Sequence, residues 1–221
     1  MNRIICIEGN IGSGKSTLLA HLEKLYTGNK QVVFLKEPVD DWETIKDGNG
    51  TTMLQKFYGD QTKYSFPFQM MAFISRLSVL KKTMQEHKSA IIISERSLFT
   101  DKFVFAKMLF DDNKIEDVNY QIYLKWFDEF ANDFLVQNVI YVKTDPTICH
   151  DRICKRSRTG EENIKLEYLT SCHEYHEDFI TNHMKCDQII LDGNIDIFEN
   201  KDALEVWTNQ IQYLILSSLS H

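Results

Sequence analysis

The residues from Gly9 to Ser16 read Gly-Asn-Ile-Gly-Ser-Gly-Lys-Ser and match the pattern G-x-x-x-x-G-K-[ST] at every fixed position. They follow the apolar run Ile4–Ile7 and precede an amphipathic stretch, which predicts a strand, a glycine-rich turn and a helix. Such a turn directs backbone N–H groups and the positive helix end at one place, which suits a triphosphate. Lys15 would reach the β- and γ-phosphates, and the Ser16 hydroxyl would bind Mg²⁺. The predicted phosphate-binding residues are Gly9, Asn10, Ile11, Gly12, Ser13, Gly14, Lys15, Ser16 and Thr17.

Two acidic residues follow other apolar runs. Glu37 comes after Val32–Leu35 and precedes Pro38, whose fixed φ would hold the turn. A carboxylate opposite the phosphate-binding loop could accept the proton of an attacking hydroxyl group. Glu95 and Arg96 end a third run, where the carboxylate could hold Mg²⁺ or its waters and the guanidinium could bind a transferred phosphoryl group. Taken alone, a Glu before a Pro at a strand end is more often a turn residue, and Glu95 with Arg96 could equally be a surface ion pair beside a helix start.

Four cations lie between Arg152 and Arg158 in a chain whose net charge is −7. Phosphoryl transfer spreads negative charge over the equatorial oxygens, and arginines that close over these oxygens stabilise it. The following segment, Thr159–Asn163, has the composition of a flexible polar turn, as a lid requires. We therefore predict an arginine-rich lid over about residues 152–163, although a solvated basic helix end would have the same composition.

Aromatic and amide side chains alternate between Leu54 and Arg76. Most of these aromatic residues are expected to belong to the core, because they recur at helical spacing. Gln69 is the exception, since an amide presents a donor and an acceptor together and can pair with the edge of a base. Phe105, in the helix after the third apolar run, could stack on the same base.

Short β-branched runs alternate with longer helical patterns, which predicts an α/β fold of the P-loop NTPase type: a parallel five-stranded sheet with helices on both faces. The predicted strands are Ile4–Glu8, Val32–Lys36, Ala90–Ser94, Val139–Lys143 and Gln188–Leu191. The predicted helices are Lys15–Tyr26, Leu54–Tyr58, Phe66–His87, Leu98–Leu109, Asn119–Phe134, Pro146–Arg156, Lys165–His183 and Lys201–Leu219, with Val39–Thr52 as an exposed turn. Residues 1–221 are expected to form one domain, with the ligand at the carboxyl ends of the strands.

The composition excludes several classes of protein. An acidic chain is not expected to bind nucleic acid through a general basic surface. No apolar run approaches the roughly 20 residues that span a bilayer, and the first strand leaves no room for a targeting segment, so a cytoplasmic location is expected. The five cysteines include no C-x-x-C pair, and we expect them to be reduced.

Taken together, these features resemble the deoxynucleoside kinase family, in particular its cellular and viral deoxycytidine and deoxyguanosine kinase branch. The resemblance runs in order from about residue 3 to residue 183. The motifs that carry it are the phosphate-binding loop, Glu37-Pro38-x-x-x-Trp42, Phe66-x-Phe68-Gln69-x-x-Ala72-x-x-x-Arg76, Glu95-Arg96-Ser97-x-x-x-Asp101 and the arginine-rich lid.

The resemblance implies ATP-dependent phosphorylation of the 5′-hydroxyl group of a deoxynucleoside, a step of nucleotide salvage. It implies that Glu37 is the general base, with Lys15, Ser16, Arg96 and the lid residues Arg152, Arg156 and Arg158 on phosphate and metal and Glu95 on the Mg²⁺ side. It places Gln69 on the base edge, Phe68 and Phe105 beside the ring, Tyr58 and Glu161 on the 3′-hydroxyl group, and Trp42 and Phe57 on the pocket wall. The family also implies a homodimer, for which Phe66–His87 and Asn119–Phe134 are the candidate helices.

Arg76 and Asp101 match the pair found in the deoxycytidine and deoxyguanosine kinase branch, whereas thymidine-preferring relatives carry smaller or apolar residues there. The pair would fill the space that a thymine methyl group requires, so we expect deoxycytidine and purine deoxynucleosides to be preferred to thymidine. Three alternatives remain at this point: a kinase with thymidine preference or broad specificity, a nucleoside monophosphate kinase, and a nucleotide-binding protein without activity.

Overall fold

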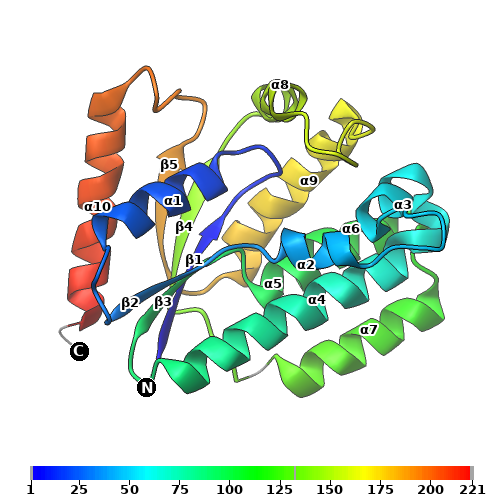
Figure 1. The fold of residues 1–221 in the computed structure, drawn as a ribbon, viewed down its shortest axis with the longest axis horizontal. Helices are drawn as coiled ribbons and strands as arrows, with labels where there is room; N and C mark the ends of the chain where they lie inside the picture. Colours follow the sequence, from blue (N-terminus) through cyan, green and yellow to red (C-terminus); the bar gives the residue numbers. More distant parts are fainter. Residues whose placement is uncertain (1, 132, 220–221) are drawn as a thin grey trace.

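In the computed structural model, which describes residues 2–131 and 133–219, five strands form one parallel sheet (Figure 1). The strands are β1 Arg3–Glu8, β2 Val32–Leu35, β3 Ile91–Glu95, β4 Asn138–Lys143 and β5 Asp187–Asp192. Their spatial order is β2-β3-β1-β4-β5. The predicted α/β fold with a five-stranded parallel sheet is confirmed, and each predicted strand differs from the observed one by a single residue at one or both ends.

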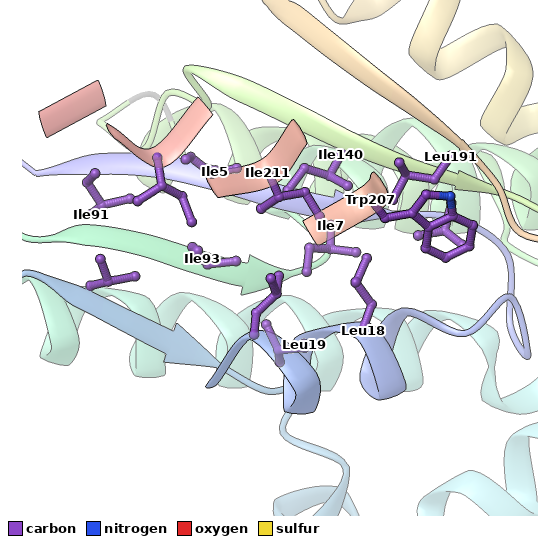
Figure 2. Close-up of a cluster of buried hydrophobic side chains, with 14 residues drawn as sticks. Ile5, Ile7, Leu18, Leu19, Ile91, Ile93, Ile140, Leu191, Trp207 and Ile211 are labelled. Atoms are coloured by element: carbon purple, nitrogen blue, oxygen red, sulfur yellow. The ribbon is translucent and has the colours of Figure 1, made fainter. Parts of the chain in front are cut away.

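Helices cover both faces of the sheet (Figure 1). Alternate side chains of β1 point to opposite faces: Ile5 and Ile7 pack with α1 and α10, whereas Ile4 and Cys6 pack with α4 and α7. Figure 2 shows the first of these cores, between the sheet and helices α1 and α10. The helical segments are α1 Lys15–Leu25, α2 Val39–Thr44, α3 Met53–Gly59, α4 Gln61–Glu86, α5 Leu98–Thr100, α6 Lys107–Asp111, α7 Asp117–Phe130, α8 Pro146–Arg156, α9 Leu166–Asp178 and α10 Lys201–Leu219, with π-helical segments at Asp101–Ala106 and Phe179–His183.

The strand order changes direction beside β1, because the chain moves from β1 toward β2 and β3 on one side and toward β4 and β5 on the other. In an open parallel sheet, ligands bind outside the carboxyl ends of the strands at such a point. The topology therefore brings the loops after β1, β2 and β3 to one place.

None of the helices in residues 2–131 and 133–219 has the length and apolar composition needed to span a lipid bilayer.

Five predicted elements need correction. Residues 39–52 are not only an exposed turn, because α2 occupies Val39–Thr44 and buries Trp42. Helix α4 begins at Gln61 and not at Phe66, since the Asp60 side chain accepts a hydrogen bond from the Lys63 N–H and caps the helix there. The predicted helices Leu98–Leu109 and Lys165–His183 both contain a π-helical segment.

The fifth of these elements is the predicted helix Asn119–Phe134. Helix α7 runs from Asp117 to Phe130, so the predicted end at Phe134 is wrong. Asn132, within the predicted range, lies outside the described residues.

Candidate active site

A cavity of about 560 Å³ lies at the carboxyl ends of the strands. The phosphate-binding loop and the basic residues of α8 form one end, and aromatic residues of α2, α3 and α4 form the other. All the site residues predicted from the sequence line this cavity except Gly9 and Asn10, the first two residues of the loop. The predicted residues that do line it are Ile11, Gly12, Ser13, Gly14, Lys15, Ser16, Thr17, Glu37, Trp42, Phe57, Tyr58, Phe68, Gln69, Arg76, Glu95, Arg96, Asp101, Phe105, Arg152, Arg156, Arg158 and Glu161.

The loop between β1 and α1 has a backbone conformation that requires glycine. Gly14 caps α1 with a φ of 105°, and Gly12 has a φ of 78°. A Cβ atom on Gly12 would lie 2.6 Å from the Cys149 carbonyl oxygen, so even a methyl side chain would force the loop away from α8. The glycines therefore hold the loop at the start of α1, where its N–H groups can face an anion.

Lys15 is the first residue of α1, and its side chain is buried. Its amine donates a hydrogen bond to the Asn10 carbonyl oxygen at 2.7 Å, across the loop. Burial, and then the charge of Arg96, lower the pKa of the Lys15 amine to about 8, although Glu95 and Glu37 act in the opposite direction. Arg96 is buried as well, so the loop end of the cavity presents two buried cationic side chains to an anionic ligand.

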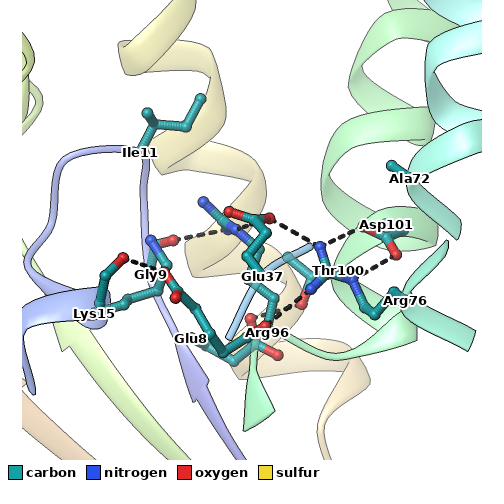
Figure 3. A network of polar contacts seen from close by, with 12 residues as sticks. Glu8, Gly9, Ile11, Lys15, Glu37, Ala72, Arg76, Arg96, Thr100 and Asp101 are labelled. Atoms are coloured by element: carbon teal, nitrogen blue, oxygen red, sulfur yellow. Dashed lines mark hydrogen bonds and ion pairs between the residues drawn. The ribbon is translucent and has the colours of Figure 1, made fainter. Parts of the chain in front are cut away.

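Glu37 lies between two arginines from other elements, Arg76 of α4 and Arg96 after β3 (Figure 3). Its Oε1 accepts a hydrogen bond from Arg76 Nη2 at 2.8 Å and is 3.3 Å from Arg96 Nε. Burial acts to raise the pKa of Glu37, but the charges of Arg96, Arg76 and Lys15 outweigh it and lower this pKa to about 2. Glu37 is therefore a carboxylate at any physiological pH.

Arg76 is bound on its other side by Asp101, the first residue of the π-helical segment Asp101–Ala106. Arg76 Nε donates to Asp101 Oδ2 at 3.0 Å, and Arg76 Nη1 donates to the Glu95 carbonyl oxygen at 2.9 Å. Arg76 is 5% exposed and Asp101 is 2% exposed. A buried ion pair needs hydrogen bonds such as these, because each charged group has lost its hydration.

Arg96 has a backbone φ of 65°, which is rare for residues other than glycine and marks a constrained position. Its Nη1 donates to the Gly9 carbonyl oxygen at 2.9 Å and lies 3.2 Å from His176 Nε2. The guanidinium carbon lies 4.8 Å from the centroid of the Phe105 ring. Phe105 thus supports Arg96, a contact that the sequence did not predict.

The Ser16 hydroxyl group donates to Glu95 Oε1 at 2.6 Å, so the two predicted metal ligands are in direct contact. Hydroxyl and carboxylate oxygens are the donors that Mg²⁺ prefers, and Mg²⁺ commonly binds one or two protein carboxylates while phosphates and waters complete its shell. No group of three or more His, Cys, Asp or Glu side chains in the part of the chain that the structure describes could hold a metal by itself. Ser16 and Glu95 therefore fit an ion that arrives with a phosphate ligand.

Aromatic side chains and the Gln69 amide line the end of the cavity distant from the loop. Phe57 and Phe68 stack with ring centroids 4.4 Å apart, and Trp42 meets Phe68 edge-on. Gln69, which also lines this end, is buried, and its Oε1 has no hydrogen-bond partner among the residues that the structure describes. A buried acceptor without a partner is costly unless a ligand satisfies it, so this wall fits a planar ring with polar edges.

The predicted lid begins inside α8 and ends in a turn. Arg156 and Arg158 both pair with Glu161, whereas Arg152 donates to the carbonyl oxygen of Gly193 at 2.8 Å. Two residues of the predicted polar turn, Gly160 and Glu161, are buried. Gly160 is packed against α3, where an added Cβ would lie 3.2 Å from the Gln55 side chain.

Two parts of the site were not predicted from the sequence. The segment 193–198, after β5, lines the cavity beside Arg152, and Trp207 of α10 lies there as well. The only signal in the sequence for the segment 193–198 was its position after the carboxyl end of a predicted strand. Helix α9 supplies the second part, which consists of Tyr168 on the cavity wall and His176 beside Arg96.

A glycine loop at the start of a helix, a buried carboxylate between arginines and a pocket for a planar ring define a phosphotransferase of the P-loop class. The model of the family described as deoxynucleoside kinase matches residues 5–216. The chain belongs to the deoxynucleoside kinase family.

Named relatives agree with this assignment. A protein of Fowlpox virus (strain NVSL) named probable deoxycytidine kinase is 36% identical over 182 residues, which cover 81% of this chain and 72% of the viral protein. Human deoxycytidine kinase is 31% identical over 226 residues, with 93% and 84% covered. Human mitochondrial thymidine kinase 2 is 30% identical over 179 residues, with 80% and 64% covered. The chain is therefore a deoxynucleoside kinase, an enzyme of phosphoryl transfer, and not a nucleotide-binding protein without activity.

Proposed function

We propose that this enzyme phosphorylates the 5′-hydroxyl group of deoxycytidine and of purine deoxynucleosides in preference to thymidine. The observation that carries the preference is the buried Arg76–Asp101 pair, whose Nε and Oδ2 are 3.0 Å apart beside the Gln69 wall. The relatives include enzymes named for deoxycytidine and for thymidine, so their names alone leave the base open.

The pair favours bases with an exocyclic amino group or a ring acceptor at this edge. Its two charged groups can bond such an edge, and together they fill the volume that a thymine methyl group would need. Accommodating the methyl group would require Arg76 or Asp101 to move, which leaves a buried charge without its partner. Gln69 would bind the same base through its Oε1, which has no partner in the described part of the chain, and through its amide nitrogen.

In the proposed reaction, the 5′-oxygen attacks the γ-phosphorus, the bond from that phosphorus to the β–γ bridging oxygen breaks, and the hydroxyl proton goes to Glu37. A carboxylate with a pKa near 2 is a weak base, so Glu37 acts mainly by orienting the hydroxyl group and takes the proton late, as a loose transition state allows. Lys15 and Arg96 would stabilise the charge on the transferred group, and Arg152, Arg156 and Arg158 would close over it. Ser16 and Glu95 would hold Mg²⁺, which neutralises phosphate charge when bound.

The sugar and base would occupy the apolar end of the cavity. Tyr58 and Glu161 lie on its wall, where they would bind the 3′-hydroxyl group. Trp42, Phe57 and Phe68 would enclose the base, and Phe105 would contact it with the ring edge or face that Arg96 does not cover.

The direct test incubates the purified protein with Mg²⁺ and ATP and, separately, with each of the four deoxynucleosides, and follows 5′-monophosphate formation. We expect a higher kcat/KM for deoxycytidine or a purine deoxynucleoside than for thymidine. Thymidine as the best substrate would refute the base preference and leave the reaction standing. Product from none of the four, with product from a nucleoside monophosphate, would refute the proposed acceptor.

We also propose that two copies of the chain associate through α4 and α7. Helix α7 exposes an apolar stripe, Val118, Ile122, Trp126 and Phe130, at a spacing of four residues, and α4 exposes Ile74. A stripe of this kind on a water-soluble helix is typical of an interface, and two identical faces can pair by two-fold symmetry.

Replacement of one residue tests this association. Trp126→Asp is expected to convert the dimer to a monomer in sedimentation velocity, because an interfacial charge would be buried without a partner. Tyr213→Asp, on the exposed side of α10 across the sheet, is the matched control and should leave the dimer intact. A wild-type protein that sediments as a monomer at high concentration would contradict the proposal.

A further inference from the structure

His176 is a fully buried histidine on α9 that the proposed reaction does not use directly. Its Nε2 lies 3.2 Å from Arg96 Nη1, and its Nδ1 lies 2.6 Å from the Cys172 carbonyl oxygen, one turn earlier in the helix. The Phe105 ring meets the imidazole edge-on, with centroids 6.0 Å apart. His176 and Phe105 thus both contact the Arg96 guanidinium.

The two partners determine which ring nitrogen carries the proton. A carbonyl oxygen can only accept, so Nδ1 must donate to Cys172. A guanidinium can only donate, so Nε2 must be the unprotonated acceptor for Arg96. Burial and the charge of Arg96 lower the pKa of His176 well below its ordinary value, which agrees with a neutral ring.

Arg96 needs such an acceptor because its side chain is buried and its backbone is held in a rare conformation. Its Nη1 has two N–H groups, and the Gly9 carbonyl oxygen and His176 Nε2 are placed to accept one each. A neutral imidazole satisfies the second N–H without neutralising the guanidinium, so the positive charge remains available to an anionic ligand. A carboxylate at the same place would satisfy the N–H but would cancel that charge.

We propose that His176 is a positioning residue for catalysis, which fixes the orientation of the Arg96 guanidinium while preserving its charge. This inference rests on the proposed function, in which Arg96 binds the transferred phosphoryl group. The same helix also contacts the phosphate-binding loop, since Asn10 Nδ2 donates to the Leu169 carbonyl oxygen at 2.8 Å. Helix α9 therefore contacts both the phosphate-binding loop and Arg96, and fixes their positions relative to each other.

A variant series tests the role. His176→Leu is expected to lower kcat roughly 10- to 100-fold, the effect of one lost hydrogen bond to a charged group, with the KM values for ATP and nucleoside changed about twofold or less. His176→Gln should recover much of the kcat, because its side-chain oxygen can accept from Arg96. His173→Leu is the matched control, one turn away on α9 without a bond to Arg96, and should match wild-type kcat.

A double-mutant cycle and a spectroscopic measurement separate positioning from general packing. In an Arg96→Lys background, His176→Leu should lower kcat little further, because the contact that it removes is already lost. Long-range ¹H–¹⁵N spectra should show His176 neutral with the proton on Nδ1 at pH 6. If His176→Leu does not fold, His176→Asn, which is too short to reach Arg96, takes its place in the cycle.

Wild-type kcat in the folded His176→Leu variant, an equal loss of kcat in both backgrounds, or a proton on Nε2 would each overturn the inference. A failure of the proposed function would give a different result from a failure of this inference. In that case the wild-type enzyme would phosphorylate none of the four deoxynucleosides, while the spectrum would still report whether His176 accepts from Arg96.

Discussion

Glu37→Gln is expected to lower kcat by about 10²-fold or more while ATP binding stays nearly unchanged. The amide keeps the shape of the carboxylate but cannot take the proton of the 5′-hydroxyl group, and it loses the charge that faces Arg76 and Arg96. Single-turnover rates with the best nucleoside and direct titration of ATP measure the two quantities separately. Glu43→Gln, an exposed carboxylate on α2, is the control and should retain wild-type kcat.

The pH dependence of the free energy of unfolding provides a second measurement on Glu37. Its pKa is about 2 in the folded protein and has an ordinary value of 4.5, so the folded state favours the carboxylate. The Glu37 carboxylate therefore contributes fully to the free energy of unfolding above pH 4.5. This contribution is lost as the pH falls through the folded pKa of about 2. Glu37→Gln should therefore lose less stability than wild type between these two values in acid unfolding. Unchanged turnover in the variant would remove Glu37 from the role of base.

Asp101→Ala is expected to destabilise the protein by about 3–5 kcal/mol, because it leaves Arg76 buried with one partner fewer. Removing both charges with Arg76→Leu and Asp101→Ala should cost less than the sum of the two single changes, since no buried charge is then unpaired. Urea unfolding with a common m-value measures these differences. Glu86→Ala, which removes an exposed ion pair with Lys82 on the same helix, is the control and should cost about 1 kcal/mol or less.

The double variant also reports on base preference. Without the two charged groups, the pocket has room for a thymine methyl group and no longer bonds the polar edge of cytosine or a purine. We expect the ratio of kcat/KM for thymidine to that for deoxycytidine to rise at least tenfold, about 1.4 kcal/mol of discrimination. An unchanged ratio in a folded double variant would show that the pair supports the structure and does not select the base.

The phosphate-binding loop and the order of elements were predictable from the sequence because their causes are local. The fixed positions from Gly9 to Ser16 are contiguous, and Gly9, Gly12 and Gly14 all have the positive φ angles that favour glycine. The alternation of β-branched runs with helical patterns likewise predicted the parallel sheet. Helix ends were less predictable, since a capping side chain such as that of Asp60 decided where α4 begins.

The arrangement of the acceptor site depended on tertiary structure. Glu37, Arg76 and Asp101 come from three separate parts of the chain, and only the packing of α4 against the end of β3 brings a carboxylate oxygen of Glu37 and one of Asp101 within 3.0 Å of the Arg76 guanidinium. The sequence by itself determined which groups could take part in phosphoryl transfer. Only the fold decided that Phe105 and His176 contact Arg96 and that the segment 193–198 lines the cavity. These contacts join residues that are far apart in the chain and whose types carry no signal of their own.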